Sequence, residues 1–109
     1  MKALTYDDNK PPLALLPSAG LREIAMVQAY GALKYGTTHN YREGMEVSRN
    51  LSCALRHIYE YIDGNDLDNE SGRHHLAHAA CRLMFILQNI NDEVLIDDRY
   101  RKINKQESA

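Results

Sequence analysis

Apolar residues recur at helical spacing in three stretches of the chain, near residues 20–35, 48–62 and 73–90. The middle stretch has the clearest pattern, because its stripe repeats at spacings of four, three and four residues, as one face of a helix does. That stripe consists of Leu51, Leu55, Ile58 and Ile62. No stretch shows the strict alternation of a half-buried strand. The pattern predicts an all-α fold, a small bundle of three main helices.

Capping residues and glycines mark the expected ends of these helices. Ser18 and Ser48 stand just before the first and second helices, and serine is a favoured N-cap. Gly36 permits a left-handed stop after the first helix. The second helix is expected to close at Asp63 and Gly64.

The two ends of the chain differ from the middle. Residues 1–19 read as an extended N-terminal arm, because the adjacent Pro11 and Pro12 cannot lie inside a helix. The apolar patch of this arm, expected to pack on the body, consists of Leu13, Leu15 and Leu16. We therefore expect an arm over 1–19, a helical domain over 20–98 and a charged tail over 99–109.

Size and charge narrow the class of protein. A chain of 109 residues is about one domain, and a domain this small buries only about two-thirds of its unfolded surface, so a homo-oligomer is expected. The net charge of −2 argues against a nucleic-acid polymer as partner, since phosphate backbones need clustered cations. No apolar run is long enough to span a membrane. The start of the sequence has no signal-peptide pattern, so we expect a cytoplasmic protein.

Polar side chains line the borders of the second and third predicted helices. His57 lies at the edge of the Leu/Ile stripe, and His75 and His78 share a polar stripe with Arg82 and Asn89. Because a short loop joins these helices, we expect them to be antiparallel neighbours. Their histidine-bearing borders would then meet, with Glu60 nearby. The acidic loop above them carries Asp66, Asp68 and Glu70.

These residue types suit a nucleotide site with a divalent cation. Mg²⁺ takes oxygen ligands, which the loop acids and Glu60 would supply. The histidines suit hydrogen bonds to phosphate or proton transfer, and a transition metal could bind them directly, since residues three apart share a helix face. The alternative is that these side chains are ordinary solvent-exposed polar residues on two helix faces and bind no ligand.

The order of short motifs along the chain resembles that of phage dATP/dGTP diphosphohydrolases, relatives of the MazG enzymes. The motifs include Tyr30–Gly36, Asn40–Gly44, Ala54–His57, Gly64–Gly72 and His75–Ala80. The resemblance implies a MazG-like, oligomeric, all-α fold. It also implies hydrolysis of a purine deoxynucleoside triphosphate to monophosphate and pyrophosphate with Mg²⁺ or Mn²⁺.

The candidate site residues follow from the polar stripes and these motifs together. Those expected to act in catalysis are Glu60, His57 and His78. Those expected to bind the substrate are Lys10, Lys34, Tyr35, Asn40, Arg42, Arg56 and His75. Those expected to hold the metal ion are Asp66, Asp68 and Glu70.

The chain also departs from the family pattern. MazG enzymes typically carry Glu-x-x-Glu on one helix and Glu-x-x-Asp on the next, where this chain has His57 with Glu60 and His75 with His78. Asn65 stands where the acidic loop usually has Glu. Two other functions therefore remain open. One is a non-catalytic protein that sequesters a nucleotide or cyclic nucleotide, and the other is a helical interaction module.

Overall fold

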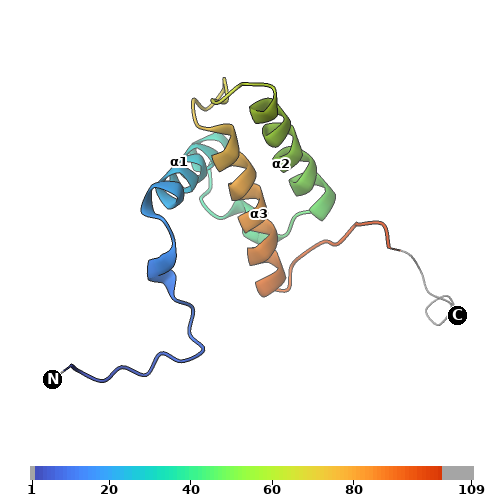
Figure 1. The fold of residues 1–109 in the computed structure, drawn as a ribbon. Helices are drawn as coiled ribbons and strands as arrows, with labels where there is room; N and C mark the ends of the chain where they lie inside the picture. The colour runs from blue at the N-terminus through green and yellow to red at the C-terminus, as the bar shows by residue number, and fades with distance from the viewer. Residues whose placement is uncertain (1, 102–109) are drawn as a thin grey trace, which may run out of the picture.

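The computed structural model describes residues 2–101 and consists of three α-helices with two short 3-10 turns (Figure 1). The helices are α1 (Ser18–Tyr35), α2 (Val47–Ile62) and α3 (His75–Asn91), and the 3-10 turns are η1 (Leu13–Leu15) and η2 (Asn40–Glu43). Between residues 2 and 101 the extended pairing is limited to two isolated bridges, Glu46 with Ile96 and Leu67 with His74. The predicted all-α fold is confirmed.

The observed helix ends agree with those predicted from the sequence at some positions and differ at others. Gly36 takes the left-handed conformation after α1, with φ 73°, as predicted. The expected capping by Ser18 and Ser48 is wrong. Pro17 is the N-cap of α1 and Ser18 is already helical, so the backbone donors there have no serine cap. Glu46 is the N-cap of α2, while the backbone N–H of Ser48 donates to Asp98 at 2.9 Å, which anchors the chain after α3 to the start of α2.

The third helix begins two residues later than the predicted Arg73. The Nδ1 of His74 accepts the backbone N–H of Leu76 at 3.0 Å and so caps the helix. The preceding residues cannot join the helix because Leu67 and His74 form a bridge that folds the loop back on itself. His75 is consequently the first helical residue.

The three helices pack around α3. Figure 1 shows α2 and α3 lying side by side and antiparallel, as predicted, with α1 packed against the other side of α3. Val27, Ala77 and Cys81 form the buried core between α1 and α3. Small residues at this contact let the helices approach closely. Burial raises the pKa of the Cys81 thiol to about 11, so it is an un-ionised, core-filling group.

Two asparagines are fully buried, one on α2 and one on α3. Asn89 binds the segment around η2: its Oδ1 accepts the N–H of Met45 at 3.0 Å and its Nδ2 donates to the carbonyl of Tyr41 at 2.9 Å. Asn50 accepts from Arg82 at 3.3 Å. The predicted polar stripe of α3 is therefore partly buried. Its residue Asn89 holds the loop that leads into α2.

Much apolar surface stays outside this small core. Ile62, which belongs to the predicted apolar stripe of α2, is 67% exposed, and Leu87 on α3 is 69% exposed. The arm runs away from the helices in Figure 1, and the expected packing of its leucines on the body is not observed. These exposed leucines are Leu13, Leu15 and Leu16. Among residues 2–101, no helix is both long and apolar enough to cross a membrane.

Candidate functional site

A cleft of about 380 Å³ lies between α1, the segment around η2, and the α2–α3 pair. This volume falls within the range typical of small-molecule sites, roughly 300–1,000 Å³. The basic, acidic and imidazole side chains that line it are Lys34, Arg56, His57, Asp68, Glu70, His78 and Arg82. Tyr30, Tyr35, Tyr41 and Phe85 supply aromatic surface. The cleft therefore combines cations, imidazoles and carboxylates with flat apolar groups.

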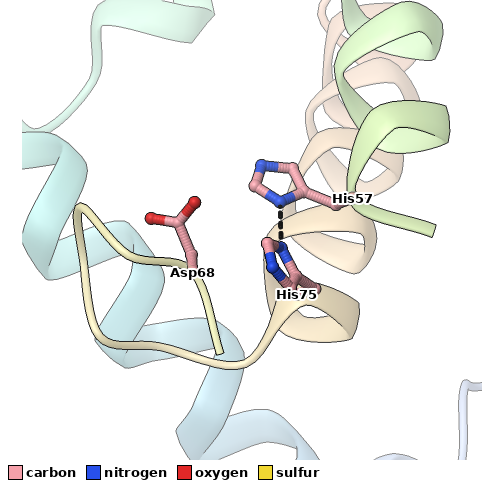
Figure 2. Close-up of side chains that lie close together, drawn as sticks. All are labelled: His57, Asp68 and His75. Carbon is pink, nitrogen blue, oxygen red and sulfur yellow. Dashed lines mark hydrogen bonds between the residues drawn. The ribbon is translucent and has the colours of Figure 1, made fainter. Parts of the chain in front are cut away.

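Three histidines from two helices form a cluster at one side of the cleft. The Nδ1 atoms of His57 on α2 and His75 on α3 lie 2.8 Å apart (Figure 2). The ring of His57 also stacks on that of His78, with centroids 4.4 Å apart and planes at 10°. The predicted meeting of the two histidine-bearing helix borders is confirmed. His75 is buried at the first turn of α3.

Burial keeps two of these imidazoles uncharged. It lowers the pKa of His57 to about 4, with the nearby His78 adding to the effect. Burial also lowers the pKa of His78, although the carboxylate of Asp68 acts in the opposite direction. At neutral pH both rings are therefore neutral, and each keeps a nitrogen lone pair that can accept a proton or bind a cation.

Asp68 faces the histidine pair from the loop before α3, as Figure 2 shows. Burial acts to raise the pKa of Asp68, but hydrogen bonds from Ser71 outweigh it, and the pKa is lowered. The backbone N–H of Ser71 donates to Oδ2 of Asp68 at 2.8 Å, and the Ser71 hydroxyl lies 2.6 Å from Nε2 of His78. Asp68 is thus an ionised carboxylate, and Ser71 links it to His78.

The other acid of the cleft is already paired. Glu70 forms an ion pair with Lys34 on α1 at 2.9 Å. Hydrogen bonds from Tyr30 and then Lys34 lower the pKa of the Glu70 carboxyl. This contact joins the acidic loop to α1 beside the cleft.

An aromatic pair also lines the cleft. Tyr41 of η2 stacks on Phe85 of α3, with centroids 4.1 Å apart and planes at 11°. The carbonyl of Tyr41 is held by the buried Asn89. A rigid aromatic face of this kind can stack on a nucleobase.

The structure brings together most of the residues proposed from the sequence. Those in or beside the cleft are Lys34, Tyr35, Asn40, Arg56, His57, Asp68, Glu70, His75 and His78. Sequence reasoning assigned no site role to Arg82 and Ser71. Arg82 lies seven residues after His75, on the same polar stripe of α3, and that spacing was a usable signal.

Four proposed residues lie outside the cleft. Glu60 is on the outer border of α2, where it accepts from the side chain of Asn65 at 2.8 Å. The side chain of Asp66 is exposed, while its carbonyl accepts the N–H of His75 at 2.8 Å. Arg42 contacts the hydroxyl of Tyr41, and Lys10 is on the exposed arm. The expected oxygen site of Asp66, Asp68 and Glu70 is consequently not assembled, because Asp66 does not line the cleft and Glu70 pairs with Lys34.

The histidine cluster predicts a fall in stability at acidic pH. The unfolded chain protonates His57 near its ordinary pKa of 6.5, whereas the folded chain protonates it only near 4. The stabilisation is therefore complete above about pH 6.5 and is lost as the pH falls towards 4. We expect a lower melting temperature at about pH 5 than at about pH 7.5, measured by circular dichroism. His57→Gln should reduce that difference, whereas the exposed His39→Gln should not. If the melting temperature of His57→Gln changed with pH as much as that of the wild type, protonation of His57 would not be the cause.

Comparison with known proteins identifies the family of this chain. The sequence profile of the family described as "dATP/dGTP diphosphohydrolase, N-terminal" matches residues 1–99. A dATP/dGTP diphosphohydrolase of Salmonella phage PMBT28 is 39% identical over 99 residues, which cover 91% of this chain and 33% of the phage protein. The chain thus spans about a third of the length of that relative. No solved structure matches the chain. The chain belongs to the family of N-terminal domains of dATP/dGTP diphosphohydrolases.

Proposed function

We propose that the cleft hydrolyses purine deoxynucleoside triphosphates to a monophosphate and pyrophosphate. The observation that carries this proposal is the histidine cluster with Asp68, set in a cleft of about 380 Å³ that also holds Lys34, Arg56 and Arg82. These cations suit a triphosphate, and Tyr35 and the Tyr41–Phe85 pair suit a base. The name of the phage relative supports the same reaction.

His78 is the acid–base group of this proposal. A water oxygen forms a bond to the α-phosphorus while the bond from that phosphorus to its bridging oxygen breaks, and pyrophosphate leaves. The proton of the water passes through the hydroxyl of Ser71, 2.6 Å from Nε2 of His78, to the neutral imidazole. His57 supports the ring of His78 by stacking on it. The scheme makes no use of Glu60, Asp66, Lys10 or Arg42.

A divalent cation is implied by the family, and Mg²⁺ or Mn²⁺ is the expected ion. Mg²⁺ requires oxygen ligands in near-octahedral geometry. The described residues do not offer that set, since Asp66 does not line the cleft and Glu70 pairs with Lys34. Asp68 instead converges with two imidazoles. This donor set does not fit a dedicated Mg²⁺ site.

The homo-oligomer is part of the proposal. Wound at roughly 100° per residue, α2 carries an exposed apolar stripe on the side away from His57, and α3 carries one away from His78. The stripes consist of Leu55, Tyr59 and Ile62 on α2, and Leu76, Leu83, Leu87 and Ile90 on α3. Two antiparallel helices with such a face suit pairing with a second copy as a four-helix bundle.

Disruption of that face should release monomers. Leu87→Asp is expected to sediment with the mass of one chain, 12.5 kDa, because a carboxylate would be buried at the interface. The wild type and the control Leu33→Asp, which alters an exposed leucine on α1, should sediment as a larger species. A wild type of monomer mass would refute the interface.

Because the proposed substrates are free nucleotides, we expect the reaction to take place in the cytoplasm. This would be the host cytoplasm if the chain is phage-encoded. The boundaries at 1–19, 20–98 and 99–109 remain a prediction, and residues 102–109 of the tail lie outside the described residues.

A second candidate is a protein that sequesters a nucleotide or cyclic nucleotide without turnover. The observation that favours it is the pairing of both cleft carboxylates, Asp68 with Ser71 and Glu70 with Lys34. Calorimetry separates the two functions. Tight binding with recovery of intact ligand, with or without metal, favours sequestration.

Incubation of the purified chain with dGTP or dATP and Mn²⁺ tests the first candidate. Chromatography should detect dGMP or dAMP, and a coupled pyrophosphatase assay should detect an equal amount of pyrophosphate. His78→Gln should lower the rate, and His39→Gln should not. A failure to release pyrophosphate from any common nucleotide would contradict the proposal.

A further inference from the structure

The donor atoms of three residues converge beside the cleft. One ring nitrogen each from His57 and His75 and one carboxylate oxygen of Asp68 all lie within 4.8 Å of one another. They come from α2, the first turn of α3 and the loop between these helices (Figure 2). Among the described residues, no other three His, Cys, Asp or Glu side chains meet in this way.

We infer that His57, Asp68 and His75 bind a divalent transition-metal ion of the Zn²⁺ or Co²⁺ class in preference to Mg²⁺. Imidazole is a ligand of transition metals, whereas Mg²⁺ selects oxygen. Two imidazoles and one carboxylate also leave a coordination position open, as catalytic zinc sites do. The binding of the ion does not depend on turnover, while its part in hydrolysis rests on the proposed function.

The distances require only a small adjustment. Metal–nitrogen bonds of about 2.0–2.1 Å in a tetrahedral site set ligand nitrogens about 3.3 Å apart. The Nδ1 atoms of His57 and His75 are 2.8 Å apart, so the rings need to separate by about half an ångström. Rotation of the Asp68 side chain, with its backbone N–H still bonded to Arg73, would bring a carboxylate oxygen inwards.

The three ligands are otherwise held in position. The N–H of His75 donates to the carbonyl of Asp66 at 2.8 Å, which fixes the first turn of α3. The N–H of Asp68 donates to the carbonyl of Arg73 at 2.8 Å, and Oδ2 accepts from Ser71. His57 is stacked on His78. Support of this kind around a ligand set raises metal affinity, because few conformations are lost on binding.

The competing explanation is a plain hydrogen bond between the two imidazole rings, with no metal. It accounts for the 2.8 Å contact of His57 and His75, and the hydrogen bond from Ser71 holds Asp68 without an ion, so a direct test of metal binding decides between the two. A bound ion would act as a Lewis acid towards a phosphoryl oxygen.

Titration of the full, chelator-treated chain with Co²⁺ in the absence of nucleotide tests the inference. We expect a visible absorption band that saturates at one equivalent and is removed by Zn²⁺. A thousandfold excess of Mg²⁺ over Co²⁺ should leave the band in place. The absence of a band and of Zn²⁺ binding heat, or equal competition by Mg²⁺, would overturn the inference.

Variants and a wild-type measurement assign the ligands. His75→Gln and His57→Gln should each weaken Co²⁺ binding by at least about 100-fold, whereas the exposed His39→Gln should leave it unchanged. Since a ligand variant can also unfold, Co²⁺ is added to the wild type and its imidazole NMR signals are followed. Broadening confined to the cluster supports the site, and broadening only of His39 or of no histidine refutes it.

The outcomes separate this inference from the proposed function. Binding of Co²⁺ and Zn²⁺ without any hydrolysis would defeat the hydrolase and leave the metal site standing. Hydrolysis with Mg²⁺ and no binding of Co²⁺ or Zn²⁺ would support the hydrolase and refute the metal site.

Discussion

Asp68→Asn is expected to reduce pyrophosphate release from dGTP by at least about 100-fold. The substitution removes the negative charge that faces the histidine pair but keeps an oxygen that can accept the N–H of Ser71. The loop should therefore keep its fold while losing its charged group. The rate is measured by the coupled pyrophosphatase assay at saturating nucleotide.

Asp63→Asn is the matched control for this prediction. Asp63 is an exposed carboxylate at the end of α2, outside the cleft, so its neutralisation should leave the rate unchanged. An Asp68→Asn protein that is folded and retains wild-type activity would show that this carboxylate has no part in the reaction.

Asn89→Ala is expected to lower the free energy of unfolding by roughly 2–5 kcal/mol. The fully buried amide serves the N–H of Met45 and the carbonyl of Tyr41, and alanine would leave both without their partner. Urea denaturation followed by circular dichroism measures the change. The amides near η2 should also exchange hydrogen faster, because this side chain ties that segment to α3.

Asn91→Ala provides the comparison two residues further along α3. Asn91 is exposed and bonds only its neighbour Asp92 among the described residues, at 3.1 Å, so its loss should change stability by less than about 0.5 kcal/mol. Equal effects of the two substitutions would mean that burial of Asn89 does not stabilise the loop.

The helices and the histidine cluster could be predicted because local rules determine them. Helical periodicity set His57, His75 and His78 on the borders of two helices, and a short connection made those helices antiparallel neighbours. The predicted contact is observed as the 2.8 Å approach of His57 to His75.

The loop and the caps could not be predicted because distant contacts decide them. Asp66 and Asp68 are the same residue type in the same loop, yet only Asp68 lines the cleft, where its carboxylate accepts the N–H of Ser71. Ser48 is a good N-cap by residue type but binds Asp98, fifty residues away. Asn89 lay on a stripe expected to be polar surface and is fully buried, since its partners come from the segment around η2.

A ³¹P NMR time course of dGTP with the purified chain and a divalent metal tests the central claim most directly. The account predicts that the three triphosphate signals are replaced by one monophosphate and one pyrophosphate signal, and that Asp68→Asn stops this change. Triphosphate signals that persist, or the appearance of orthophosphate with dGDP, would contradict it.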